Sequence, residues 1–366
     1  MYQATRSPVT TSDVARVAAV SRVSVSRVLN NHANVTDKMR QRVLQAAADV
    51  GYISHQSVPA GLATNGGPAR PLVVLRTIGF FFASLQGLDA ATSNPFWSPV
   101  LHGVEQEASA AGIAVIYQSI NQSLGEPEAQ IGKVLTAPPD GTLLVGPASA
   151  ATVEALTRTE RPLVLVENDV PSANVDAVVS DSFAGARAAV AHLIDAGHRE
   201  IAFIGGPFTV SPPPARHRAN SVWSIEQRAL GYWTALREAG VQPDYALYEG
   251  DNLGTAGGYR ACKRLLAARR PFSAIFCAND ETAVGAMRAL HEAGLTVPND
   301  VSVVGFDDIA VAAHLIPPLT TLRVQKEAIG AWAVRRLLER ALAPNTPATI
   351  LTIRAELIQR GTVARH

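Results

Sequence analysis

Cysteine, long apolar runs and charge are all scarce in this chain of 366 residues. Its two cysteines, Cys262 and Cys277, are too few for a disulfide framework or a four-thiolate zinc site, and their apolar surroundings predict small buried side chains. No apolar run approaches the roughly 18 residues that a membrane-spanning helix needs, and no signal peptide is recognisable. Charged residues make up 17% and hydrophobic residues 47%, which excludes disorder as the main state. A cytoplasmic protein is expected.

Motifs of the common enzyme classes are also missing. The sequence has no Walker-type phosphate loop, no Gly-x-Ser-x-Gly elbow and no H-E-x-x-H pair among its nine histidines. Gly205-Gly206-Pro207 lacks the glycine order of a dinucleotide loop, and Asp307-Asp308 lacks metal-ligand spacing. The sequence therefore predicts a protein that is not an enzyme, with no catalytic residues, no cofactor and no metal site.

Basic residues concentrate at the N-terminus. Residues 1–55 contain seven Lys or Arg and three Asp, whereas the remaining chain contains 25 basic and 28 acidic residues. A small basic head on a mildly acidic body is typical of a protein whose head meets phosphate. The length favours two or three domains, because a single core rarely grows this large.

The basic head is predicted to form three short helices, at about 11–18, 21–29 and 37–50. Ser21 suits the N-cap of the second helix, in which Val25, Val28 and Leu29 have the i, i+3, i+4 spacing of a buried stripe. Two helices joined by a tight turn are the ingredients of a helix-turn-helix. A plain three-helix bundle with a solvated basic face has the same pattern and stays an alternative.

The outer side of the second helix carries the candidate DNA contacts. Arg22 and Arg27 could reach guanine O6 and N7, and Val23 could touch a thymine methyl group. Ser21 and the free N–H groups behind it could bind a phosphate at the helix N-terminus. The candidate residues in the head are Thr11, Ser21, Arg22, Val23, Ser24, Ser26, Arg27 and Asn30.

A proline- and glycine-containing linker at 54–71 separates the head from alternating strands and helices. Strands are predicted at 72–82 in part, 114–118, 141–145, 163–167, 177–180, 201–204, 274–277 and 301–306. Helices are predicted at 99–111, 184–196, 225–239, 255–268, 281–293 and 325–342. Such alternation gives parallel sheets covered on both faces, so the expected fold is a small all-α head followed by an α/β core of two doubly wound parallel-sheet lobes. A cleft between lobes is the natural ligand site.

Short motifs along the chain carry a family resemblance. They include Asp13-Val14-Ala15, Val20-Ser21, Val25-Ser26-Arg27-Val28-Leu29-Asn30, Val35-Thr36, Gly51-Tyr52-Ile53, Ser93-Asn94-Pro95-Phe96-Trp97, Ala278-Asn279-Asp280 and Val303-Val304-Gly305-Phe306-Asp307-Asp308. With this spacing and order, the chain resembles the LacI/GalR family of bacterial transcriptional regulators. The resemblance implies that the helix beginning at Ser21 enters the major groove, where Arg22 and Val23 set operator choice. The chain departs from the family pattern at Ala19, where glycine is usual, and at Leu62, a candidate minor-groove wedge that lies one residue late.

The same resemblance implies three parts. These are a helix-turn-helix domain at 1–55, a hinge or linker at 56–71, and a ligand-binding and dimerisation core at 72–366 that is similar to periplasmic sugar-binding proteins. The first lobe is expected at about 72–196 and 325–343, and the second at about 197–323 and 344–363. The chain then crosses between lobes near 196–198, 322–325 and 343–347.

Candidate effector contacts follow from strand ends and from the resemblance. Asp307 and Asn279 follow predicted strands, at whose carboxyl ends ligands of open α/β lobes sit. Arg228 matches an arginine that commonly binds ligand oxygens in the family. The predicted set is Phe96, Trp97, Glu167, Ser224, Arg228, Asn252, Asn279 and Asp307. The alternatives are a turn acid for Asp307, a helix cap for Asn279, a surface ion pair for Arg228 and core packing for the aromatic residues.

Together these features predict a sequence-specific repressor whose operator affinity is changed by a small sugar or sugar acid bound between the lobes. Each head reads one half-site, so a homodimer on double-stranded operator DNA is expected, without a membrane partner. Two alternatives remain: a regulator of the same build that activates or needs no effector, and a sensor of a non-sugar ligand such as a purine.

Overall fold

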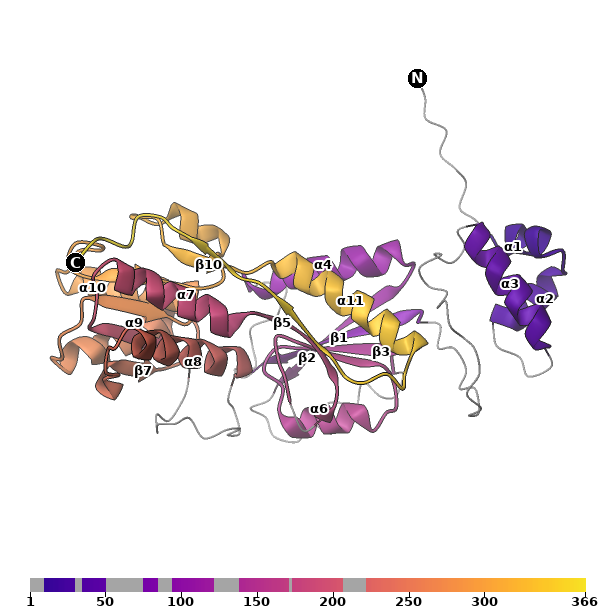
Figure 1. The fold of residues 1–366 in the computed structure, drawn as a ribbon, viewed down its shortest axis with the longest axis horizontal. Coiled ribbons are helices and arrows are strands. Elements are labelled where there is room, and N and C mark those ends of the chain that lie inside the picture. Colours follow the sequence, from indigo (N-terminus) through magenta and orange to yellow (C-terminus); the bar gives the residue numbers. More distant parts are fainter. Residues whose placement is uncertain are drawn as a thin grey trace, which may run out of the picture. The chain divides into compact units, whose positions relative to one another are not determined.

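The computed structural model describes residues 10–29, 35–50, 75–84, 94–121, 138–170, 173–206 and 222–366. The chain divides into two compact units, Met1–Val73 and Val74–His366, and each has its own hydrophobic core. Figure 1 colours them along the sequence, from indigo at the N-terminus to yellow at the C-terminus. Across the described ranges, no helix is both long enough and apolar enough to cross a bilayer.

The described part of the first unit contains helices α1 (Thr11–Ala18), α2 (Arg22–Leu29) and α3 (Asp37–Asp49). Their core consists of the small aliphatic residues Val14, Ala15, Ala18, Val25, Val28, Val43, Ala46 and Ala47. The predicted helices are therefore confirmed. The N-cap of α1 is Thr10, whose backbone N–H donates to Asp13 Oδ2 at 3.0 Å.

The turn between α1 and α2 depends on Ala19 and Arg42. Ala19 has the left-handed conformation, with φ 49° and ψ 49°, at the position where the family pattern has glycine. A side chain in this conformation costs on the order of 1–2 kcal/mol. Arg42 of α3 donates Nε to the carbonyl of Ala18 at 2.6 Å and Nη2 to that of Ala19 at 2.7 Å. These bonds satisfy carbonyl groups that the end of α1 leaves open, and they fix the turn.

The first lobe of the second unit is a parallel sheet with the strand order β11-β5-β4-β3-β1-β2. Its strands are β1 (Thr77–Ser84), β2 (Ala114–Asn121), β3 (Gly141–Val145), β4 (Leu163–Val166), β5 (Asp176–Ser180) and β11 (Ile350–Ile353). Helices α4 (Trp97–Ala110) and α11 (Lys326–Leu342) cover one face, and α6 (Ala150–Thr157) covers the other (Figure 1). Phe80 and Phe82 point to the first face and Phe81 to the second, as alternation along a strand requires.

The second lobe is a parallel sheet with the order β7-β6-β8-β9. Its elements are β6 (Ile201–Gly205), β7 (Tyr248–Gly250), β8 (Ala274–Cys277), β9 (Ser302–Val304), α7 (Ser182–Asp195), α8 (Trp223–Glu238), α9 (Thr255–Ala267) and α10 (Asp280–Glu292). Phe203 and Phe276 pack with α7 and α8 residues, and Ile204 and Ile275 pack with α9 and α10 residues. Cys262 and Cys277 are buried free thiols, as predicted.

Two of the three predicted lobe crossings are wrong. Helix α7 packs against α8 in the second lobe, so the first crossing lies at Asp181 rather than near 196–198. Strand β11 pairs with β5 in the first sheet, so the third crossing follows Ile353 rather than 343–347. The second crossing follows β10 (Thr321–Arg323), as predicted. β10 pairs antiparallel with β12 (Glu356–Ile358), and Asp181 N donates to Ile353 O at 2.8 Å, which brings the crossings together.

Candidate functional site

The exposed face of α2 is the first candidate site. Ser21, Arg22, Val23, Ser26 and Arg27 are all exposed, and Val23 is 60% exposed although it is apolar. Ser21 Oγ accepts from the Ser24 N–H at 3.1 Å, which confirms Ser21 as the N-cap of α2. The exposed residues therefore stand on a helix whose opposite face is fixed in the head core.

The remaining predicted DNA contacts are half-buried or lie outside the described residues. Thr11 and Ser24 are half-buried, at the start of α1 and in the first turn of α2. Asn30 and Leu62 lie outside the described residues. The structure thus shows an exposed face on α2, and the DNA contacts of this face and the Leu62 wedge stay predictions.

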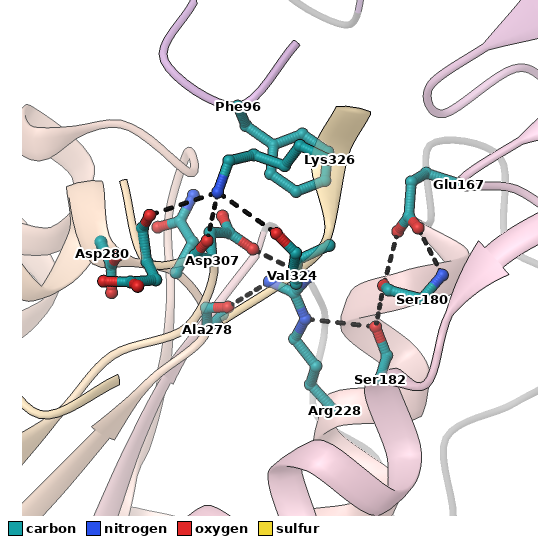
Figure 2. A network of polar contacts seen from close by, with 12 residues as sticks. Phe96, Glu167, Ser180, Ser182, Arg228, Ala278, Asp280, Asp307, Val324 and Lys326 are labelled. Carbon is teal, nitrogen blue, oxygen red and sulfur yellow. Dashed lines mark hydrogen bonds and ion pairs between the residues drawn. The ribbon is translucent and has the colours of Figure 1, made fainter. Parts of the chain in front are cut away.

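A buried ion pair is the centre of the second candidate site (Figure 2). Arg228 of α8 and Asp307, which follows β9, have side chains that are 4% and 8% exposed, and Arg228 Nη2 lies 3.1 Å from Asp307 Oδ1. Arg228 also donates to Ser182 Oγ and to the carbonyl of Ala278, and its Cζ lies 3.7 Å from the centre of the Phe306 ring. This burial excludes the surface ion pair that was the alternative for Arg228.

Asp307 retains acceptor capacity. Asp307 Oδ1 lies 3.1 Å from Arg228 Nη2 in the ion pair, and within the described ranges it accepts no further hydrogen bond. Burial raises the pKa of Asp307, while Arg228 and Lys326 oppose that rise. Its φ of 106° and the φ of 49° at Asp308 place two consecutive side chains in the left-handed region, at a cost on the order of 1–3 kcal/mol each. A strained, buried acceptor of this kind suits a ligand hydroxyl.

Glu167 brings the first lobe to this network. It directly follows β4, is 3% exposed, and accepts from both the backbone N–H and the hydroxyl of Ser180. Ser180 Oγ lies 3.3 Å from Ser182 Oγ, which in turn accepts from Arg228. Burial raises the pKa of Glu167 to about 7, although Arg228 and the Ser180 bonds act in the opposite direction. Two hydroxyl groups thus connect a first-lobe carboxyl group to the second-lobe arginine.

Two further charged groups border the ion pair. Asp280 accepts from Thr321 Oγ1 and from the Ile309 N–H, and burial together with Asp307 raises its pKa to about 8. Lys326, the first residue of α11, donates to the carbonyls of Asp307, Asp308 and Val324 (Figure 2).

The other predicted effector residues differ in their placement. Ser224 is buried one helical turn before Arg228, on the same face of α8. Phe96 is buried, with Trp97 half-buried and in edge contact at 4.7 Å, and Trp97 also packs against Phe82. Phe96 and Trp97 thus take part in core packing.

The two asparagines serve the local fold in this structure. Asn279 caps α10 by accepting from the Thr282 N–H, and its amide donates to Leu253 O, so the helix-cap alternative is the one found. Asn252 Oδ1 accepts from the Gly254 N–H in the turn before α9. The contacts of Asn252 and Asn279 within the described ranges do not join them to Arg228.

Sequence reasoning missed Ser180, Ser182 and Lys326. The two serines stand at the carboxyl end of β5, so the strand-end rule that found Asp307 could have found them. Lys326 has no such signal. A lysine at the start of an amphipathic helix reads as solvated until its buried carbonyl partners are known.

Comparisons with known proteins identify the family of this chain. Residues 10–55 match the model "Bacterial regulatory proteins, lacI family", and residues 190–363 match a periplasmic binding protein-like domain. The ribose operon repressor of Haemophilus influenzae is 30% identical over 97% of this chain and 98% of its own length. This chain belongs to the LacI family.

Other LacI-family proteins match over the same length. The probable repressor ExuR of Bacillus subtilis is 28% identical over 98% of this chain and 99% of its own. The transcriptional regulator CelR in complex with cellobiose has a TM-score of 0.70 at 28% identity, with 97% of this chain and 100% of that one covered. A lac repressor dimer bound to operator has a TM-score of 0.67 at 26% identity, with 98% and 100% covered. The predicted family and fold class are confirmed.

Proposed function

We propose that this chain is a sequence-specific transcriptional repressor whose operator affinity changes when a small sugar-like molecule binds between the core lobes. The observation that carries the proposal is the presence of two reading sites in one chain: the exposed basic face of α2 and the buried Arg228–Asp307 pair at the lobe junction. The first suits base edges and phosphates, and the second suits hydroxyl groups. We further propose that the role is regulatory rather than catalytic and that the protein acts in the cytoplasm, together with its DNA partner.

The relatives support this assignment. One is named for the ribose operon, a neighbouring structure holds cellobiose, and another is a dimer on operator DNA. The acceptor at Asp307 and the fork of Arg228 favour paired hydroxyl groups, as in a neutral sugar. Phe96 and Trp97 would offer the ligand an aromatic edge of the core in which they pack, and Glu167 and Ser224 would add polar contacts. Asn252 and Asn279 would contact the ligand in addition to their local bonds.

Ligand-dependent unfolding tests the effector half of the proposal. The purified protein is heated with D-ribose, cellobiose, D-galacturonate or hypoxanthine, and a ligand at a hundredfold over its Kd should stabilise it by about 2.7 kcal/mol. Arg228→Ala should abolish that stabilisation, whereas the head variant Arg22→Ala should keep it. Stabilisation by hypoxanthine alone favours the purine sensor. A flat panel together with intact operator binding favours the effector-independent regulator.

A homodimer follows from half-site recognition. On the second lobe, Ile316 is 96% exposed and Val311 is 46% exposed, around the 3-10 helix Ala310–His314. We take these apolar side chains to contact a second copy. Sedimentation velocity of Ile316→Lys should show a shift from dimer to monomer, and an unchanged dimer would place the interface elsewhere.

A further inference from the structure

Asp308 forms ion pairs with arginines next to two of the segments that connect the lobes. Arg323 Nε lies 2.7 Å from its Oδ2, and Arg360 Nη2 lies 2.6 Å from its Oδ1. Arg323 is the last residue of β10, immediately before the second crossing, and Arg360 follows β12 after the third crossing. The Asp308 side chain is only 8% exposed, so both of its oxygens are committed inside the junction.

Lys326 reaches the same place from the first lobe. It begins α11, which packs against α4, and it is 8% exposed. Its Nζ lies 2.6 Å from Asp307 O, 3.2 Å from Asp308 O and 3.4 Å from Val324 O. A first-lobe helix thereby holds the backbone of the second-lobe dipeptide and of the crossing segment.

The clamped dipeptide also contains the proposed effector carboxylate. Asp307 faces Arg228, while Asp308 faces Arg323 and Arg360. The backbone N–H of Asp307 donates to Leu322 O of β10 at 2.7 Å. If Asp307 moves when a ligand binds, β10 and the arginines bound to Asp308 must therefore move with it or lose these contacts.

We propose that Asp308 and Lys326 form a clamp that sets the angle between the two core lobes and passes the state of Asp307 to the crossing segments. Both act as positioning residues. The proposal rests on the proposed function only in naming effector binding at Asp307 as the trigger. The contacts of the clamp itself do not involve the effector.

A matched control exists within the second lobe. Asp251 also holds two arginines, Arg260 and Arg264, through both of its carboxylate oxygens. All three residues belong to the β7–α9 region, and their hydrogen bonds to described residues stay within the second lobe. Asp251→Asn and Asp308→Asn therefore remove the same charge from the same kind of contact, and only the second alters the junction.

The distance between a spin label on each lobe, measured by double electron–electron resonance, reports changes in the angle between the lobes. Cysteines are introduced at exposed positions of each lobe, Glu105→Cys on α4 and His291→Cys on α10, and are spin-labelled. The native Cys262 and Cys277 are buried, and burial raises the pKa of both thiols, so they should resist labelling. Labelled protein is exchanged with excess unlabelled protein, so that the distances report one protomer.

The width of the distance distribution decides the proposal. We expect Asp308→Asn and Lys326→Met to widen it at least twofold, and Asp251→Asn to match the parent protein. Arg323→Gln, at a 43% exposed side chain, removes one arm of the clamp without burying a new group and should widen it too. Unchanged widths in Arg323→Gln and Lys326→Met overturn the clamp, even if Asp308→Asn fails to fold. Neither DNA nor effector is used, so failure of the proposed function leaves this result readable.

Discussion

The proposed DNA-binding residues of the head and the proposed effector-binding residues of the core lie in opposite environments. Arg22 and Arg27 are exposed on α2 above a core of alanine and valine side chains, whereas Arg228 and Asp307 are almost completely buried against each other. A DNA backbone brings its own charge to a protein surface, but a small ligand must satisfy groups that are already out of water. Removal of a charged side chain should therefore weaken DNA binding when it is made in the head, and it should lower the free energy of unfolding when it is made in the core.

The largest effect is expected from Arg228→Met, which removes the charge and keeps most of the volume. It leaves Asp307 buried without its partner, and breaking a buried pair in this way costs about 3–5 kcal/mol of unfolding free energy. Urea denaturation measures the loss. Arg237→Met, at an exposed site on the same helix, should lie within about 0.5 kcal/mol of the parent.

The double variant Arg228→Met/Asp307→Asn sharpens the test. It removes the stranded carboxylate, so part of the lost stability should return. If the double variant is as unstable as the sum of the two single variants, the cost comes from packing against Phe306 rather than from charge.

The pH dependence of stability should be the next largest effect. The pKa of Glu167 is raised from its ordinary 4.5 to about 7. Between these values the folded protein holds a proton that the unfolded chain has lost. Stability is therefore greatest below about pH 4.5 as far as this group is concerned, and it falls as the pH rises toward 7, by at most about 1.4 kcal/mol per pH unit.

Urea denaturation of Glu167→Gln at pH 5, 6 and 7 checks this direction. The variant should lose stability less steeply than the parent over the interval. Asp280, whose pKa is raised to about 8, contributes a slope of the same sign, so some decline should persist. Glu105→Gln, at an exposed site of α4, should follow the parent. A decline equally steep in both variants would assign the effect to Asp280 and other groups.

The same contrast explains what the sequence could predict. Each head helix has its buried side chains three or four residues apart, so the spacing within the sequence was enough to predict it. The strain at Ala19 followed from a single residue type. In the core, the apolar strands β3, β4 and β8 were visible as runs. The strands β7, β10 and β12 span three residues each and were missed, because none lies in a longer apolar run such as 301–306, which predicted the equally short β9.

The local sequence pattern does not show to which lobe a strand or helix belongs. β11 joins the first sheet through pairs such as Ile350 with Ala177, which are far apart in the sequence, and α7 packs on α8 although it directly follows a first-lobe strand. The strand-end rule found Asp307 because it concerns one element. It missed the role of Lys326, whose partners are backbone carbonyls that only tertiary packing brings together.

Operator binding should respond to Arg22→Ala by roughly 1–3 kcal/mol, the worth of one bidentate base contact. The operator is first selected from random DNA, and affinities are then compared by gel shift at fixed salt. Arg16→Ala, at an exposed site of α1, is the control for general charge loss. Because Arg22 is exposed, the stability of the head should be unchanged. Equal affinity and equal sequence preference in Arg22→Ala and the parent contradict its assignment to the groove.

The smallest effect concerns the turn that presents α2. Replacing Ala19 by glycine relieves a left-handed side chain, worth about 1–2 kcal/mol, and adds freedom to the unfolded chain at a cost of about 0.4–1 kcal/mol. A net gain on the order of 0.5 kcal/mol is expected in urea denaturation of the head. Ser12→Gly, at an exposed position of α1, adds freedom to the unfolded chain without relieving strain, so it should destabilise the head. If Ala19→Gly destabilises as much, the bonds from Arg42 to Ala18 and Ala19 already hold the turn so firmly that its strain does not limit the stability of the head.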